Sequence, residues 1–405
     1  MTAFLLIVFS LFALNFVWWA WADAWLPKGR RYAGWRVAVG GLALGMAGLF
    51  AFFIYARMRD LDGAVPHVVV MAVYLWHLIV LPGVLVALLG RALVRVVTGL
   101  FSRSRSRVVT PAPPQPAIAT TGAPGPTRRQ LLAASLVAAT PPLAQVAAMS
   151  SAIGQVGAFR VRQIDVAYHN LPAALDGVTI AHLSDTHFGR FTNRRDVKRI
   201  AEATNRLDVD VVAFTGDLID FDLDDLPLGI DLLKGLTPRH GTVVCEGNHD
   251  LFQDRDAFER SVQRASFPLL LNGDHTIAIN GHPVQFLGLQ WGSAARPRDP
   301  MLAQAAEQTL AQRRPDAFGV LLAHHPHAFD FAADAGVPLT LAGHSHGGQL
   351  MLTPNLGPGP MMYRYWSGLY RRGDAACVVS NGIGNWFPLR VNAPAEIVHI
   401  RLRNA

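Results

Sequence analysis

Five short apolar runs in the second half of the chain each end in a cluster of polar residues, and this repeated pattern constrains the fold most. The clusters are Asp185-Thr186-His187, Gly216-Asp217, Gly247-Asn248-His249-Asp250, His324-His325-Pro326 and Gly343-His344-Ser345-His346. A short run rich in β-branched residues and bounded by Gly and polar residues is typical of a buried strand. In open α/β sheets, the ligand crevice lies at the carboxyl ends of the strands. The pattern therefore predicts a sheet with one polar, ligand-binding edge.

The residue types in these clusters are those that bind divalent metal ions. Carboxylate and amide oxygens and imidazole nitrogens are all metal ligands. Seven of them, converging, are too many for one tetrahedral zinc. They suit two ions about 3.5–4 Å apart that share a carboxylate and activate a water. Asp185-Thr186-His187 alone is compatible with a capped turn, but the five clusters in this order favour a dinuclear metal centre.

The ordered clusters resemble the signature of the calcineurin-like metallophosphoesterases, which reads D-x-H, G-D, G-N-H-[DE], H and G-H-x-H. The stretch from Gly343 to Gln349 is similar to the G-H-[ST]-H-G-G-Q pattern of a membrane-associated branch. That branch is related to bacterial phosphodiesterases that act on phospholipids and lipid A precursors. The tail over 380–397 looks like its closing pattern, with Ala395 where a second Pro is common. The resemblance covers about residues 160–403.

This resemblance implies a four-layer α-β-β-α sandwich with the site at one edge. It also implies seven metal ligands: Asp185, His187 and His346 for the first ion, Asn248, His324 and His344 for the second, and Asp217 bridging both. His249 would be the general acid or a phosphate-binding group, oriented by Asp250. His324 is chosen over His325 because the family pattern reads His-x-Pro. His325 and His327 are expected to be solvated or helix-capping side chains.

The composition indicates a membrane region before the catalytic domain. Hydrophobic residues make up 51% of the 405 residues and charged residues only 16%. Apolar segments lie at 4–22, 37–55, 68–89 and 128–158, and about 20 apolar residues suffice to span a bilayer. We expect a transmembrane region over 1–158 with about four spans, an Arg/Pro-rich linker near 99–129, and a phosphoesterase domain over 159–405. His77, within the third segment, is expected to be packed or interfacial.

The distribution of basic residues predicts the orientation. The three loops are the stretches between the four apolar segments, 23–36, 56–67 and 90–127. Lys and Arg are frequent in the first loop and around the third and rare in the second, which has only Arg57 and Arg59. The positive-inside rule then places loops one and three in the cytoplasm. The fourth span, which Pro141-Pro142 makes the weakest, would deliver the catalytic domain to the periplasmic side of a bacterial inner membrane. The segment from Thr127 to Leu132 fits either a twin-arginine export motif or a cytoplasmic positive flank.

Charge and cysteine content exclude other classes. Much of the net charge of +7 is Arg near the spans, so it reflects topology, and no basic and aromatic platform for nucleic acid is present. Cys245 and Cys377 lie in predicted strands and are expected to be small buried thiols, with a disulfide permitted if the domain lies outside the cytoplasm. The absence of a C-x-x-C pair argues against a thiolate zinc site. Locally, Asn193 is expected to cap a helix, and Asn280-Gly281 predicts a two-residue hairpin.

We therefore expect a membrane-anchored hydrolase of phosphomonoesters or phosphodiesters on a lipid-linked substrate, with two Mn, Fe or Zn ions. Met361–Trp366 and Asn385–Arg390 are expected to shape the pocket, or to pack as ordinary loops. One alternative is a pyrophosphatase of the type that hydrolyses UDP-2,3-diacylglucosamine in lipid A metabolism, whose cytosolic substrate requires the opposite topology. Another is a non-catalytic membrane protein that binds metal or a partner. A complete ligand set together with His249 argues against that last alternative.

Overall fold

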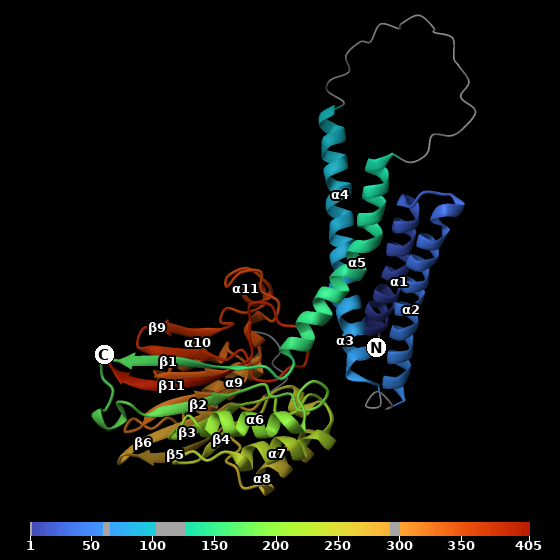
Figure 1. Cartoon of the computed structure of the whole chain (residues 1–405). Coiled ribbons are helices and arrows are strands. Elements are labelled where there is room, and N and C mark those ends of the chain that lie inside the picture. Colours follow the sequence, from blue (N-terminus) through green and yellow to red (C-terminus); the bar gives the residue numbers. More distant parts are fainter. Residues whose placement is uncertain (1, 60–64, 103–126, 292–299) are drawn as a thin grey trace, which may run out of the picture. The chain divides into compact units, whose positions relative to one another are not determined.

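The computed structural model of the chain describes residues 2–59, 65–102, 127–291 and 300–405 (Figure 1). Its contacts divide the chain into two compact units, Met1–Ser151 and Ala152–Ala405. Most of the predicted Arg/Pro-rich linker lies outside the described residues. The predicted domain boundary at residue 158 stays a prediction.

The first unit is helical. Its helices are α1 (Thr2–Trp25), α2 (Ala33–Met58), α3 (His67–Leu75), α4 (Leu81–Ser102) and α5 (Arg128–Gln155), with a π-helical turn over Trp76–Val80 and a 3-10 turn over Arg30–Tyr32. Three described segments are long and apolar enough to cross a membrane: Arg30–Ala56, His67–Gly99 and Arg128–Gln155. The helix α5 continues through Pro141-Pro142. The predicted segment 4–22 is helical within α1, and its membrane crossing stays a prediction.

His77 is packed inside the first unit. Its Nδ1 lies 2.8 Å from the carbonyl oxygen of Val73, so Nδ1 carries the hydrogen and Nε2, 3.2 Å from Nδ2 of Asn15, accepts. The ring of Phe50 stacks on the imidazole at 4.3 Å. Both ring nitrogens thus have partners, which confirms the interpretation of His77 as a packed residue.

The second unit contains two sheets. The first has the order β1 (Arg160–Tyr168), β11 (Glu396–Asn404), β2 (Thr179–Leu183), β3 (Val211–Thr215) and β4 (Thr242–Cys245). The second has the order β5 (Gly273–Ile279), β6 (His282–Gly288), β7 (Phe318–Leu322), β8 (Leu339–Ala342), β10 (Ala375–Val379) and β9 (Gly368–Arg372). The strands β2, β3 and β4 are parallel, as are β7 and β8. These five are the strands that the apolar runs predict.

The sheets pack face to face between two layers of helices. Alternate residues of each strand point to opposite faces, so Ile180 of β2 enters the core between the sheets, whereas Ala181 faces the helices. The helices α6 (Arg194–Asn205), α7 (Leu226–Gly235) and α8 (Arg255–Arg264) cover the first sheet (Figure 1). The helices α9 (Pro300–Leu310) and α10 (Ala328–Asp334) cover the second. The predicted four-layer α-β-β-α sandwich is confirmed.

Local signals in the sequence also hold. Asn193 caps α6 in a capping box. Asn280 and Gly281 have φ values of 51° and 77° between the antiparallel strands β5 and β6, as a type I′ turn requires. Cys245 and Cys377 are free, buried thiols.

Candidate metal centre

The predicted site residues follow the ends of the strands that they were expected to follow. Asp185 comes after β2, Asp217 after β3, Asn248 after β4, and His324 after β7. Backbone hydrogen bonds join these loops: the N–H of Asp185 donates to Gly216 at 2.9 Å, and that of Gly343 donates to His324 at 3.1 Å. The N–H of His344, after β8, donates to Oδ1 of Asp185 at 3.0 Å, so the carboxyl ends of both sheets contribute to one site.

The backbone at this site is unusual. Five predicted ligands have positive φ: Asp185 (54°), His187 (44°), Asp217 (56°), His344 (67°) and His346 (48°). This left-handed region is uncommon for residues other than glycine and persists only where the surrounding structure enforces it. The loops therefore hold the side chains in place at a conformational cost, as is common at functional sites.

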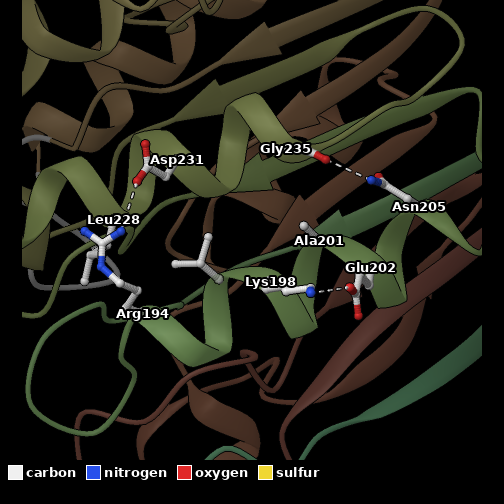
Figure 2. Close-up of a pocket in the computed structure, with 9 residues that line it drawn as sticks. Arg194, Lys198, Ala201, Glu202, Asn205, Leu228, Asp231 and Gly235 are labelled. Carbon is white, nitrogen blue, oxygen red and sulfur yellow. Dashed lines mark hydrogen bonds and ion pairs between the residues drawn. The ribbon is translucent and has the colours of Figure 1, made fainter.

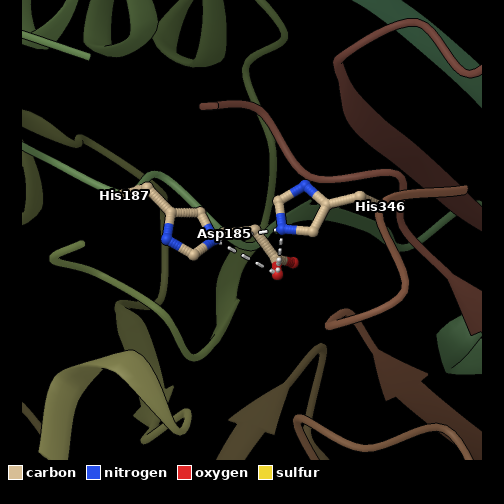
Figure 3. Close-up of side chains that lie close together, drawn as sticks. All are labelled: Asp185, His187 and His346. Atoms are coloured by element: carbon tan, nitrogen blue, oxygen red, sulfur yellow. Dashed lines mark hydrogen bonds and ion pairs between the residues drawn. The ribbon is translucent and has the colours of Figure 1, made fainter. Parts of the chain in front are cut away.

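One group of side chains comprises Asp185, His187 and His346 (Figure 3). The Nε2 atoms of His187 and His346 lie 3.0 Å apart. Nε2 of His346 lies 3.3 Å and Nε2 of His187 lies 3.9 Å from Oδ1 of Asp185. All three residues are buried. Two imidazole nitrogens that face each other beside a buried carboxylate fit a bound cation.

A second group comprises Asp217, His324 and His344. Nδ1 of His324 donates to the carbonyl oxygen of Thr215 at 2.6 Å, so its Nε2 has a lone pair to offer. That Nε2 lies 3.0 Å from Oδ2 of Asp217 and 3.3 Å from Nδ1 of His344. Oδ2 of Asp217 is also 3.5 Å from Nε2 of His187. Asp217 thus lies between the two groups, where a bridging ligand would be.

Asn248 is held beside Asp217 by the backbone of its own loop. The N–H of His249 donates to Oδ1 of Asp217 at 2.8 Å. A Cβ at Gly247 would collide with the Asp217 carboxylate, which explains the glycine before Asn248. Oδ1 of Asn248 is buried and has no hydrogen-bond partner among the described residues. A buried amide oxygen without a partner fits the predicted ligand role.

Asp250 does not orient His249 as the resemblance implies; it organises the backbone instead. Its carboxylate accepts hydrogen bonds from four backbone N–H groups: Gly247 (2.8 Å), Asp217 (2.9 Å), Leu218 (2.7 Å) and Ile219 (3.1 Å). Burial and the charge of Asp217 raise the pKa of Asp250 to about 7, against these donors. The side chain therefore ties the loop after β4 to the loop after β3.

Asp220 orients the His249 ring, a role that no motif in the sequence indicates. Nδ1 of His249 lies 2.6 Å from the carbonyl oxygen of Asp220 and 3.3 Å from Oδ1. The same Oδ1 lies 3.5 Å from Nδ1 of His187. Burial opposes ionisation, but the hydrogen bonds from both imidazoles prevail and lower the pKa of Asp220 to about 2. The one available signal was a carboxylate in the same loop as Asp217.

Arg390 is a packed residue of its loop, in agreement with the packing alternative for Asn385–Arg390. It is buried, and Nη2 lies 3.0 Å from Nδ1 of His346. The guanidinium also donates to the carbonyl oxygens of Asn381 (2.7 Å), Gly384 (2.7 Å), Ala393 (3.1 Å) and His346 (3.4 Å) and to Oδ1 of Asn385 (2.7 Å). Burial lowers the pKa of Arg390 to about 10. Arg390 therefore fixes the turn that carries His346.

The other residues expected at the pocket divide into two kinds. Tyr365 and Phe387 are buried, and the hydroxyl of Tyr365 donates to Oδ1 of Asp330 at 2.8 Å. Met361 and Trp386 are exposed. The prediction that these loops pack in the ordinary way is therefore correct for Tyr365 and Phe387 but not for Met361 and Trp386.

His325 and His327 are buried rather than solvated. Their rings stack at 4.5 Å, and Nδ1 of His325 accepts from the backbone N–H of His327 at 3.2 Å. His327 precedes α10 but makes no side-chain capping bond there. The expectation of solvated or capping side chains is wrong because this turn packs against the second group, with His325 and His344 5.0 Å apart.

Trp291 forms an aromatic wall beside the second group. Its ring centroid lies 5.3 Å from that of His324 and 5.0 Å from that of His344. The backbone N–H of Trp291 donates to Oε1 of the buried Glu246 at 2.9 Å, and its carbonyl oxygen accepts from Arg255. Burial raises the pKa of Glu246 to about 8. No motif marked this tryptophan in the sequence.

A separate groove of about 340 Å³ lies between α6 and α7 (Figure 2). Its sides carry ion pairs, Arg194 with Asp231 at 4.0 Å and Lys198 with Glu202 at 3.7 Å. None of the predicted ligands lines it. The groove is therefore distinct from the metal centre.

Comparison with known proteins shows which family this chain resembles. The profile of the calcineurin-like phosphoesterases matches residues 178–348. The uncharacterized metallophosphoesterase YkuE of Bacillus subtilis is 31% identical over 58% of this chain and 82% of its own. A transmembrane protein with metallophosphoesterase domain from Danio rerio is 29% identical over 61% of this chain and 58% of its own. The phosphodiesterase YaeI of Escherichia coli is 26% identical over 55% of this chain and 81% of its own.

Proposed function

Because this chain belongs to the calcineurin-like metallophosphoesterase family, we propose that it is a membrane-anchored enzyme that hydrolyses a lipid phosphate or lipid-linked phosphodiester. Family membership makes the chain a metal-dependent hydrolase of phosphoric esters. The observation that carries the metal-dependent hydrolysis is the position of the Asp217 carboxylate between His187 of the first group and His324 of the second.

We assign the first ion to Asp185, His187 and His346, and the second to Asn248, His324 and His344, with Asp217 shared. This mixture of nitrogen and oxygen ligands suits Mn, Fe or Zn. Divalent ions bound there supply Lewis acidity to the phosphoryl group and lower the pKa of a water toward about 7.

The remaining residues position groups and move a proton. Since Nδ1 of His249 donates to Asp220, its Nε2 is the atom that can face a substrate. A protonated Nε2 would donate to the leaving oxygen as bond cleavage proceeds. Asp250 shapes the loop that carries Asp217, and Arg390 fixes the ring of His346.

Membrane anchoring is supported by the three candidate spans and by relatives named transmembrane proteins. The last candidate span ends at Gln155 and β1 begins at Arg160, so the tether to the catalytic unit is short. The Arg and Lys of loops one and three favour a cytoplasmic position for these loops, and α5 would then lead to the periplasmic side of a bacterial inner membrane. A site tethered there suits a lipid substrate better than a cytosolic nucleotide.

The test is a comparison of substrates with the full-length protein in detergent, supplied with Mn. We expect kcat/KM to be higher for lipid phosphates and lipid-linked phosphodiesters than for cyclic nucleotides and sugar phosphates. A clear preference for soluble nucleotides would defeat the lipid assignment. Hydrolysis of UDP-2,3-diacylglucosamine above all other substrates would favour the pyrophosphatase alternative.

A further inference from the structure

We propose that an apolar rim beside the metal centre inserts into the acyl-chain region of a lipid bilayer. The rim comprises Leu352, Leu356, Met361, Met362 and Trp386. This inference rests on the proposed membrane-anchored function and adds a second membrane contact, made by the catalytic unit itself. The partner of the rim is therefore a lipid surface.

The first observation is the exposure of the rim side chains. Met361 is 83% exposed, Leu352 74%, Met362 64% and Leu356 56%. Water disfavours apolar surface of this extent. Large exposed apolar patches mark protein or membrane contacts, so we expect another apolar surface to cover these side chains.

The second observation is the lack of charge. No Asp, Glu, Lys or Arg occurs between Gly347 and Tyr363. Exposed loops of soluble domains commonly carry charged side chains, whereas the acyl region of a bilayer excludes them. Trp386, 40% exposed, is of the type enriched at membrane interfaces.

The backbone around Leu352 and Leu356 is hydrogen-bonded. The N–H of Met351 donates to Val391 at 2.9 Å, and that of Leu352 donates to Leu356 at 2.8 Å. Nδ2 of Asn392 donates to the carbonyl oxygens of Met351 and Leu352 at 2.9 and 3.1 Å. Unpaired backbone groups are costly in hydrocarbon, so a loop with these bonds is suited to enter it.

The rim is also joined to the metal centre. After α11 (Pro358–Met362), the ring of Tyr363 lies 5.7 Å from that of His344. The ring of Trp386 lies 6.3 Å from that of His346. Trp386 of the rim therefore lies beside the first group, and Tyr363, which follows Met362, lies beside the second, so a lipid headgroup held at this rim would be near both.

The bilayer is the favoured occupant because the same chain carries three candidate membrane spans. The tether between Gln155 and Arg160 is too short to let the catalytic unit leave the membrane surface, if α5 crosses. A second copy of the chain or a soluble partner would have to compete with lipid that is always present. Those occupants are alternative outcomes of the experiment.

The experiment uses the full-length protein in nanodiscs at one copy per disc. An environment-sensitive fluorophore is attached to Met361→Cys, and in a matched control to Lys198→Cys, whose native side chain is 82% exposed on α6. Cys245 and Cys377 are buried, which limits background labelling. Lipids with brominated acyl chains then report contact. A label at Leu352→Cys provides a second position on the rim.

We expect a blue-shifted emission at 361 and 352 and its loss in brominated lipid, with no change at 198. Unquenched emission at both rim positions, or equal quenching at 198, would overturn the proposal. A blue shift without quenching would mean that protein covers the rim, which also overturns it. Quenching of the label does not depend on turnover. If the labelled rim is quenched and the enzyme nevertheless prefers soluble nucleotides, the lipid substrate is ruled out while insertion of the rim still stands.

Discussion

Nδ1 of His249 lies 2.6 Å from the backbone carbonyl oxygen of Asp220. A carbonyl oxygen only accepts, so Nδ1 carries the hydrogen and Nε2 is left to act on a substrate. The carboxylate of Asp220 also lies 3.5 Å from Nδ1 of His187. Asp220 therefore contacts a proposed metal ligand through its carboxylate and the proposed acid chiefly through its backbone carbonyl oxygen, as groups behind metal-binding histidines commonly do.

Replacing Asp220 should impair catalysis without unfolding the protein. Asp220→Asn removes the carboxylate charge beside His187 and keeps the backbone contact to His249, and loss of such a supporting group typically costs about 10–100-fold in activity or metal affinity. The measurement is kcat over a metal titration. Asp231→Asn, on the exposed side of α7, is the matched control and should behave as wild type. Wild-type kinetics in Asp220→Asn would show that this contact is incidental.

His249→Ala should lower turnover and leave metal content nearly unchanged, because this side chain acts on the leaving group. Loss of a general acid typically costs about 10²–10⁴-fold. The loss should shrink for nitrophenyl esters, whose leaving groups need little protonation. The comparison is kcat for alkyl and nitrophenyl esters; an equal loss for both classes would argue against the acid role.

Arg390→Lys should weaken metal binding at the first group. A lysine cannot reproduce the several directed hydrogen bonds of a buried guanidinium, so the ring of His346 would lose its support. We expect about 10–100-fold weaker binding of one ion, measured by calorimetric titration, with the fold checked by circular dichroism. Arg364→Lys, at an exposed position, is the control. Unchanged metal affinity in Arg390→Lys would refute the positioning role.

The orientation of the catalytic unit can be tested with reporters fused at Ala405. If α5 leads to the periplasm, an alkaline phosphatase fusion should be active and a green fluorescent protein fusion dark. The reverse result would place the site in the cytoplasm. That outcome would favour the UDP-2,3-diacylglucosamine pyrophosphatase alternative.

The sequence predicted the sheet and the converging clusters because strand ends are local signals. The runs before Asp185 and Asp217 have the period and boundaries of buried strands, and parallel strands bring their ends together. The side chains that contact His249 could not be predicted from the sequence. Asp220 and Asp250 are both carboxylates near the motif, and only the folded loops decide which of them reaches His249.

Burial was also hard to foresee outside the regular strands. Arg390 has the chemistry of a phosphate ligand, yet it is enclosed by backbone carbonyl groups of its own tail. His325 is buried because Trp291 and Tyr363, distant in the sequence, pack within 5.9 Å of its ring. Such contacts depend on the tertiary arrangement of loops, which neither periodicity nor spacing encodes.

A dinuclear centre bridged by Asp217 is tested by measuring both metal content and turnover in Asp217→Asn. The amide removes the negative charge that holds two cations close together. We predict that the wild type binds two ions per chain, and that the variant, folded by circular dichroism, loses at least one ion and nearly all hydrolysis. Full activity of Asp217→Asn with two ions still bound would show that Asp217 is not the bridging ligand.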